Sequence, residues 1–85
     1  MRENKDYAWV IRGKQRKKVI KSLTRLKIPS QIKGDTKLSL NNVSDVLRAF
    51  QKKKIARCLN PKEKTGRLYE LTPKGMRIRE ELEKY

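Results

Sequence analysis

Two long stretches of the chain place apolar residues at helical spacing. The first predicts a helix over Lys14–Leu26, because its apolar residues fall on one helical face: Val19, Ile20, Leu23 and Leu26. The second predicts a helix over about Leu40–Lys53, with Ser39 as its N-cap. Its apolar residues recur at i, i+3, i+7 and i+10, and its opposite face is polar. Both stretches are therefore expected to bury one face in a shared core.

Two shorter segments flank the first of these helices. Residues Tyr7–Ile11 alternate loosely between apolar and polar, which fits a short extended segment; a helix beginning near Asp6 is the competing interpretation. On the other side, Pro29 is suited to the first turn of a short second helix that ends at Gly34–Thr36.

The period of the pattern changes to two after the second long helix. Ile55–Asn60 and Arg67–Leu71 are predicted to be strands of a hairpin. The loop between them, residues 61–66, is rich in turn formers, and Gly66 can supply a positive φ.

A last helix is predicted directly after the hairpin. Thr72 is its expected N-cap and Pro73 its first residue. Gly75 in the first turn is expected to be a weakness of about 1 kcal/mol relative to Ala. Met76, Ile78 and Leu82 give the helix a thin apolar stripe.

Charge is the strongest global property of this sequence. Its 85 residues suffice for one domain, and they carry 24 Lys and Arg against 9 Asp and Glu, a net charge of +15. Such a domain repels itself and favours a polyanionic partner, with nucleic acid ahead of an anionic membrane surface. No apolar run approaches the roughly 20 residues that span a bilayer, and no secretory h-region follows the first residues. We therefore expect a cytoplasmic protein without a membrane partner.

The basic residues are concentrated in one part of the chain. From Arg12 to Lys33 there are nine Lys or Arg and no acid. An exposed helix face usually carries both acidic and basic side chains, because Glu–Lys pairs support the helix. The absence of acids here therefore favours contact with phosphates over solvation alone. The candidates in the first long helix are Lys14, Lys17 and Lys18.

The residue types that enzymes and metal sites use are scarce. The single cysteine, Cys58, excludes an intrachain disulfide and is interpreted as a half-buried strand residue rather than a redox sensor. The absence of histidine excludes every His-based metal site. No Ser or Cys stands beside a plausible base. We predict no enzymatic activity, no cofactor and no metal.

The spacing of apolar and turn residues resembles the winged helix-turn-helix regulators of the MarR and ArsR type, and most closely their small archaeal members. The resemblance covers residues 14–78 and rests on these residues: Ile32, Leu38, Ser39, Leu40, Val43, Val46, Leu47, Phe50, Ile55, Gly66, Arg67, Tyr69, Leu71, Thr72 and Gly75. It implies the order helix, helix, short strand, helix, strand, wing, strand, helix.

The fold class implied is α+β, mainly α: a three-helix bundle with a C-terminal β-hairpin wing and a final helix. The domain would comprise an extension at 1–13, a winged-helix core at 14–72 and a C-terminal helix at 73–85. Lys54 stands where such proteins commonly place Gly, and a left-handed conformation there would cost about 1 kcal/mol or more. The cysteine pair of ArsR sensors and the long flanking helices of MarR proteins are absent. A homodimer is possible but not specified.

The resemblance implies that the third helix enters the major groove of double-stranded DNA and that the wing reaches the adjacent backbone or minor groove. On the polar face of that helix, amides suit adenine, an arginine suits guanine and a hydroxyl suits either base. Asp45 either accepts from a cytosine amino group or pairs with a neighbouring cation, and the Asn side chains have helix capping as an alternative role. The candidate base readers are Asn41, Asn42, Ser44, Asp45 and Arg48.

The remaining basic residues near the third helix and hairpin are candidates for backbone contacts, with a solvated hairpin tip as the alternative. They are Lys52, Lys53, Lys62, Lys64 and Arg67. The function predicted is a sequence-specific DNA-binding transcription regulator. The alternatives are an RNA- or ribosome-binding winged helix, a protein-interaction module, and a sequence-neutral chromatin protein.

Overall fold

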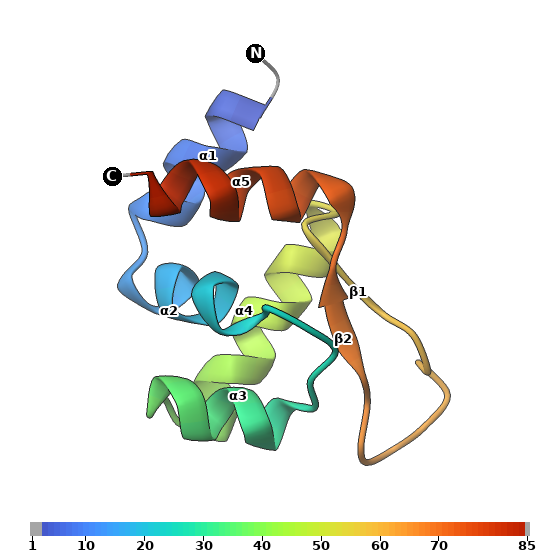
Figure 1. The fold of residues 1–85 in the computed structure, drawn as a ribbon. Coiled ribbons are helices and arrows are strands. Elements are labelled where there is room, and N and C mark those ends of the chain that lie inside the picture. Colours follow the sequence, from blue (N-terminus) through green and yellow to red (C-terminus); the bar gives the residue numbers. More distant parts are fainter. Residues whose placement is uncertain (1–2, 85) are drawn as a thin grey trace.

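The computed structural model describes residues 3–84, with side chains from residue 5 onward. Five helices and one two-stranded antiparallel sheet follow one another along the chain (Figure 1). Their bounds are α1 Glu3–Ile11, α2 Lys14–Ser22, α3 Pro29–Thr36, α4 Leu40–Lys52, β1 Ala56–Cys58, β2 Tyr69–Leu71 and α5 Pro73–Glu83. From α2 onward the order of helices, wing strands and final helix is the predicted one, while α1 is an additional helix.

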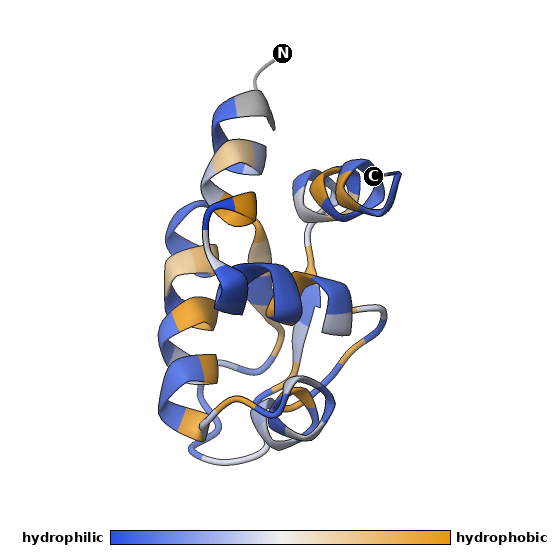
Figure 2. Cartoon of the chain, turned by 90° about the vertical axis from the view of Figure 1, so that its left-hand side faces the viewer, coloured by the Kyte–Doolittle hydropathy of each residue, from blue (hydrophilic) through white to orange (hydrophobic). Residues whose placement is uncertain are grey.

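The core lies where α2, α3 and α4 meet. α2 and α4 each contribute several apolar residues at helical spacing, and α3 contributes Ile32; hydrophobic and hydrophilic positions are coloured in Figure 2. Phe50 of α4, Ile20 of α2 and Ile32 of α3 are fully buried and are among the largest side chains of this cluster. α4 contacts both α2 and α3, so its apolar face is fixed and its polar face is left outside.

The segment Tyr7–Ile11 belongs to helix α1, so the competing interpretation is correct and the extended segment is wrong. The physical reason is that α1 packs against α5 and α2. Val10 is fully buried, and the Trp9 ring meets the Phe50 ring edge-on at 5.8 Å between centroids. The predicted extension is therefore packed on the domain; residues 1, 2 and 85 of the predicted segments lie outside the described residues.

α2 ends at Ser22, earlier than the predicted Leu26, which is 42% exposed. The chain turns away at Leu23, whose carbonyl accepts a hydrogen bond from Nη1 of Arg79 in α5 at 2.7 Å. This early exit brings Lys27 alongside Tyr69, and their backbones exchange two hydrogen bonds of 2.9 and 3.0 Å. The short strand expected between the second and third predicted helices is thus a single bridge, and it lies before α3 rather than after it.

The wing strands are shorter than predicted. β1 and β2 pair over three residues each, with Ala56 opposite Leu71 and Cys58 opposite Tyr69. One further backbone bond, from Leu59 N to Leu68 O at 2.9 Å, continues the pairing toward the loop. Pairing stops there because the Asn60 side chain takes over the hydrogen bonds of the loop ends.

A tight junction joins α4, β1 and α5. Lys54 adopts φ 60°, the left-handed conformation expected where Gly is common. Its carbonyl accepts from the Thr72 hydroxyl at 2.7 Å, and the same hydroxyl oxygen accepts from Gly75 N at 3.1 Å. A Cβ at Gly75 would lie 2.1 Å from the Ile55 carbonyl oxygen. The expectation that Gly75 merely weakens α5 is therefore wrong: a side chain there would push α5 off β1.

Candidate nucleic-acid interface

Helix α4 presents a polar face to solvent. Its N-cap, Ser39, accepts a hydrogen bond from Asn42 N at 3.1 Å, which fixes where the helix begins. The residues opposite its buried stripe are exposed and polar: Asn41, Asp45, Arg48 and Lys52. Ser44 and Asn42 lie at the two edges of this face and are half-buried. The structure thus brings all five predicted base readers to one helix, with Asn42 nearest the core.

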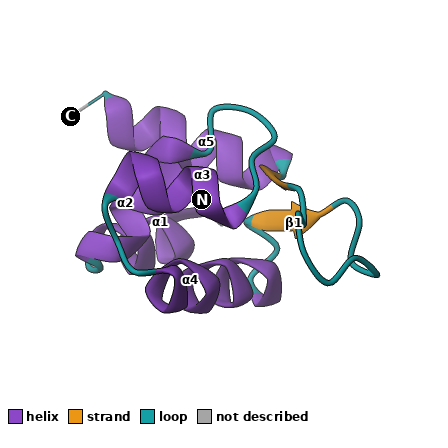
Figure 3. Ribbon diagram, turned by 90° about the horizontal axis from the view of Figure 1, so that it is seen from below, coloured by secondary structure: helices purple, strands orange, loops and turns teal. Residues whose placement is uncertain are grey.

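A groove of about 470 Å³ separates α4 from the wing. We call it the α4–wing groove, and in Figure 3 the hairpin loop stands beside the end of α4 that leads into β1. Two predicted base readers, Ser44 and Arg48, line it together with two predicted wing residues, Lys64 and Arg67. None of its lining residues is acidic. The reading and anchoring candidates therefore share one positively charged surface.

The wing tip is ordered by its own polar side chains. Asn60 donates to Gly66 O at 3.2 Å and accepts from Leu68 N at 2.7 Å, which closes the loop. Arg67 Nε donates to Glu63 O at 2.6 Å, and Gly66 has φ 67°. Lys62 and Lys64 are left exposed on this closed loop. The role of Asn60 was missed from the sequence, although Asn before Pro is a turn signal.

Asp45 and Arg48 pair on the exposed face of α4. Arg48 Nη1 lies 3.3 Å from Asp45 Oδ1, and both side chains are about 70% exposed, at 69% and 70%. An ion pair this exposed is worth roughly 0–1 kcal/mol, so solvent or a ligand can displace it. Of the two roles left open for Asp45, pairing with Arg48 is present in the free protein.

Lys53 is held at the end of α4 by other parts of the chain. Its Nζ lies 4.9 Å from the centre of the Trp9 ring and 3.9 Å from Asp6 Oδ1. Lys74 also pairs with Asp6 and donates to the Lys53 carbonyl at 2.9 Å. This network ties α1 and α5 to the C-terminus of α4. Lys52, one residue earlier, is exposed with the outer face of the helix.

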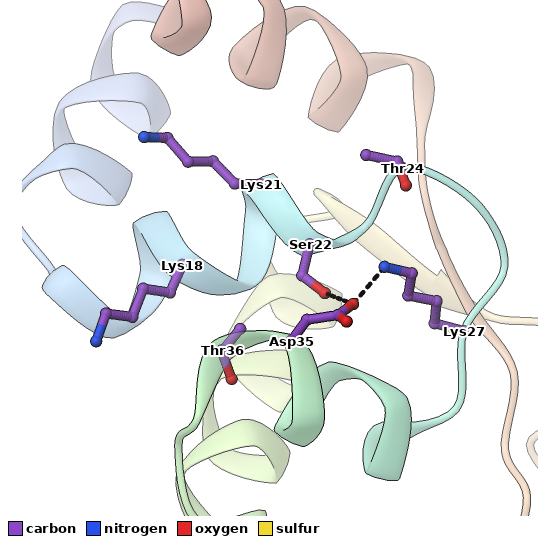
Figure 4. Close-up of a pocket in the computed structure, with 7 residues that line it drawn as sticks. All are labelled: Lys18, Lys21, Ser22, Thr24, Lys27, Asp35 and Thr36. Carbon is purple, nitrogen blue, oxygen red and sulfur yellow. Dashed lines mark hydrogen bonds and ion pairs between the residues drawn. The ribbon is translucent and has the colours of Figure 1, made fainter.

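The predicted phosphate contacts of α2 do not lie together. Lys14 is exposed and borders Asp45 and Ala49 across a hollow of about 460 Å³ on the flank of α4. Lys17 is half-buried. Lys18 lines a different hollow, of about 480 Å³, between α2 and α3, and Figure 4 shows its side chain pointing outward from α2 there. The structure therefore brings Lys14, but not Lys18, toward α4.

The hollow between α2 and α3 has a fixed polar floor. Lys27, only 8% exposed, lies 2.5 Å from Asp35 Oδ2, and Ser22 Oγ donates to the same oxygen at 2.9 Å (Figure 4). These two hydrogen bonds, the Lys27 charge and the nearby Arg25 lower the pKa of Asp35, against a smaller opposing effect of burial. The Asp35 carboxylate therefore stays ionised and bound to Lys27 and Ser22. We call this surface the α2–α3 patch; it comprises Lys18, Lys21, Ser22, Thr24, Arg25, Lys27, Asp35 and Thr36.

Three exposed polar residues of the groove were missed from the sequence. Gln51 lies three residues after Arg48 on α4, and Ser30 and Thr65 come from the first turn of α3 and from the wing loop. Gln51 could have been found, because residues at i, i+4 and i+7 share a helix face with Ser44. Ser30 and Thr65 could not, because only tertiary packing brings α3 to the wing.

The described residues offer few alternatives to this surface. No group of three or more Cys, Asp or Glu side chains among residues 5–84 could hold a metal ion. Within that range no helix is long and apolar enough to cross a membrane. Phe50 is fully buried, Tyr69 is 7% exposed, and Tyr7 and Trp9 are half-buried. The described part of the chain thus has no fully exposed aromatic ring.

Solved structures with this architecture include two regulators of the MarR family. One is BpsR of Bordetella bronchiseptica, whose DNA binding is regulated by 6-hydroxynicotinic acid; it has a TM-score of 0.78 and 16% identity over 98% of this chain and 71% of BpsR. The other is NadR in complex with 4-hydroxyphenylacetate, with a TM-score of 0.74 and 15% identity over 96% of this chain and 63% of NadR. No protein-family model matches the sequence, and neither does any curated protein.

At this identity the likeness establishes the fold alone. The expected winged helix of the MarR type is confirmed as an architecture, while the likeness to ArsR proteins and to archaeal members stays a prediction. The chain is a mainly helical winged helix with a two-stranded wing and a final helix.

Proposed function

We propose that this protein binds double-stranded DNA with a preference for sequence and regulates transcription in the cytoplasm. The observation that carries the proposal is the α4–wing groove, in which Ser44 and Arg48 of a helix face Lys64 and Arg67 of the wing. BpsR, which has the same fold, binds DNA. α4 would enter the major groove, and the wing would follow the neighbouring backbone or minor groove.

The outer face of α4 carries the chemistry for reading bases. Asn41 can bond the N6 and N7 edge of adenine in a bidentate manner, and Arg48 the O6 and N7 edge of guanine. The Asp45–Arg48 pair holds the guanidinium over this face before DNA arrives. Arg48 would exchange one exposed carboxylate partner for a base edge, which costs little because the pair is weak.

Affinity for the DNA backbone would come mainly from residues around that face, together with Lys52 at its C-terminal end. Lys14 on one flank and Lys62, Lys64 and Arg67 on the other would straddle the duplex, with Lys52 at the far end of α4. If six to eight phosphates are neutralised, the logarithm of the binding constant should fall with the logarithm of salt concentration with a slope of roughly −5 to −7. Regulation of transcription follows from such binding near a promoter.

RNA or ribosome binding is the second candidate, because the net charge of +15 suits any polyanion. Proteins that read single-stranded RNA stack bases on exposed aromatic rings. The rings described here are buried or half-buried, which favours duplex DNA. No enzymatic role is proposed, since the groove contains no nucleophile beside a base.

The test is a direct comparison of ligands at matched salt. Selection from random duplex DNA should return a consensus, and that duplex should bind more tightly than scrambled duplex or structured RNA. A symmetric consensus would also indicate a dimer on DNA. Equal binding to every duplex would replace this proposal by a sequence-neutral chromatin role, and tighter binding to RNA would replace it by the second candidate.

A further inference from the structure

The α2–α3 patch carries positive charge that the rest of the chain does not neutralise. Lys18 and Lys21 are exposed and make no ion pair with any residue from 5 to 84, and Arg25 acts on Asp35 without forming an ion pair. The one acid of the patch, Asp35, is held by Lys27 and Ser22. Like charges crowded together are destabilising unless a counter-charge covers them. The patch is therefore a surface that lacks an anionic partner.

The floor of the patch is rigid and polar. Ser22, Lys27 and Thr36 are 9%, 8% and 7% exposed. The Thr36 hydroxyl donates to Ile32 O at 2.7 Å, and the Asp35 carboxylate accepts hydrogen bonds from both Lys27 and Ser22. The one carboxylate of the patch is therefore paired with Lys27 rather than with Lys18 or Lys21. The exposed Thr24 hydroxyl lies at the edge of the same hollow.

The patch faces away from the α4–wing groove. The buried stripe of α4, including Val43 and Leu47, packs toward α2 and α3, so its outer face points the other way. In Figure 4 the Lys18 and Lys21 side chains extend from α2 away from Ser22 and Asp35. A duplex bound along α4 and the wing therefore leaves Lys18 and Lys21 uncovered.

A long polyanion fits this surface better than a small one. Lys18 and Lys21 are neighbours three residues apart on the outside of one helix, and the hollow of about 480 Å³ is open to solvent rather than enclosing. Duplex DNA presents one charge per roughly 1.7 Å along its axis and releases counterions at each phosphate that is neutralised. A free phosphate would gain neither the row of contacts nor an enclosing pocket.

We infer that the α2–α3 patch is a second DNA-binding face, which holds the sugar–phosphate backbone of another duplex segment without reading its sequence. One chain would thus join two duplexes, or two distant parts of one duplex. The inference rests on the proposed function for its choice of DNA. It assigns Lys18 and Lys21 to the second duplex and leaves Arg48 and Lys64 to the first.

The test is a bridging assay with the full chain. A biotinylated duplex is immobilised, protein is added, and retention of a second, fluorescent duplex is measured. Wild-type protein should retain the second duplex, and sedimentation with excess short duplex should give two duplexes per chain. Lys18→Gln with Lys21→Gln should reduce retention roughly tenfold or more, because two phosphate contacts are lost. Its affinity for a single duplex should match that of the control.

The matched control is Lys5→Gln with Lys84→Gln, which makes the same change in charge at exposed positions outside both faces. In wild type, mass spectrometry of lysine acetylation should show Lys64 protected by the first equivalent of duplex and Lys18 and Lys21 only by the second. This measurement needs no variant and so does not depend on the folding of one.

Several outcomes overturn the inference. One duplex per chain at saturation would do so while leaving the proposed function intact. If bridging persists in the Lys18 and Lys21 variant, a protein dimer rather than the α2–α3 patch joins the two duplexes. If labelled RNA is retained in place of the second duplex, and this retention is lost in the same variant, RNA would be the ligand of the α2–α3 patch. Absence of any duplex binding by wild type would instead overturn the proposed function.

Discussion

Arg48 Nη1 lies 3.3 Å from Asp45 Oδ1 on the outer face of α4, so a predicted DNA reader is held by an acid in the free protein. A carboxylate at this place repels phosphate, which lowers affinity for every duplex alike. A guanine offsets this repulsion, because its O6 and N7 give Arg48 two acceptors in place of the carboxylate. The Asp45–Arg48 pair would thus lower the affinity for duplexes in general and raise the preference for one sequence.

Replacing Asp45 by Asn tests this directly. We expect Asp45→Asn to bind random duplex about two- to fivefold more tightly, because one repulsive charge is gone. The ratio of affinities between selected and random duplex should fall. Both are measured by fluorescence anisotropy at fixed salt. Glu83→Gln makes the same charge change at an exposed position on α5 and should leave the ratio as it is; a fall of equal size there would refute the role of Asp45.

Arg48 and Lys64 line the same groove but should behave differently. Arg48→Ala should relax the preference at one base pair and cost about 1–3 kcal/mol of binding free energy on the selected site. Lys64→Ala should weaken all duplexes about equally and reduce the salt slope by about one. Titrations of both variants across salt concentrations and across single-base-pair variants of the site separate these effects. Identical behaviour would mean that reader and anchor are wrongly assigned.

Lys54 is a source of strain that can be removed. With φ 60° it pays about 1–2 kcal/mol for the left-handed conformation, and Gly would avoid this cost at an entropic penalty of about 0.5–1 kcal/mol. Lys54→Gly should therefore raise the free energy of unfolding by roughly 0.5–1 kcal/mol. Urea denaturation measures it. Arg48→Gly, at an exposed position inside α4, should instead lower stability by about 1 kcal/mol; if both variants lose stability, the strain at Lys54 is not real.

Asp35 makes stability depend on acid pH. Its pKa lies below the ordinary 3.8, first because Lys27 and Ser22 donate hydrogen bonds to its charged form. A carboxyl with a lowered pKa in the folded state stabilises the fold above 3.8, and this contribution is lost as pH falls through the folded pKa. Asp35→Asn should be less stable than wild type at neutral pH, with the buried Lys27 left unpaired. The two unfolding curves should converge on acidification; a constant gap would contradict the pairing.

Local signals were sufficient for most of the fold. Caps and periodicity located α4 and α5, since Ser39 and Thr72 accept the hydrogen bonds that their positions predict. The resemblance marked Lys54 as a position where such proteins commonly have Gly, and the structure has a left-handed residue there. These features depend on a few neighbouring residues, which is why the sequence alone suffices for them.

Features that depend on distant partners could not be predicted. Tyr7–Ile11 packs as a helix against α5 and Phe50, and the Leu23 carbonyl at the early end of α2 accepts a hydrogen bond from Arg79, far along the chain. Gly75 is needed because the backbone carbonyl of Ile55, just before β1, approaches it closely. For the same reason the sequence predicts a shared phosphate-contacting role for the basic residues of α2, although the fold places Lys14 and Lys18 at different surfaces.

The central claim is that the outer face of α4 and the wing tip together contact the duplex. The most direct measurement is a titration of ¹⁵N-labelled protein with one equivalent of the selected duplex, followed by amide chemical shifts. The account predicts the largest changes in residues 41–52 and 62–67, with little change in α5. Changes centred on α1 and α5, with α4 and the wing undisturbed, would contradict it.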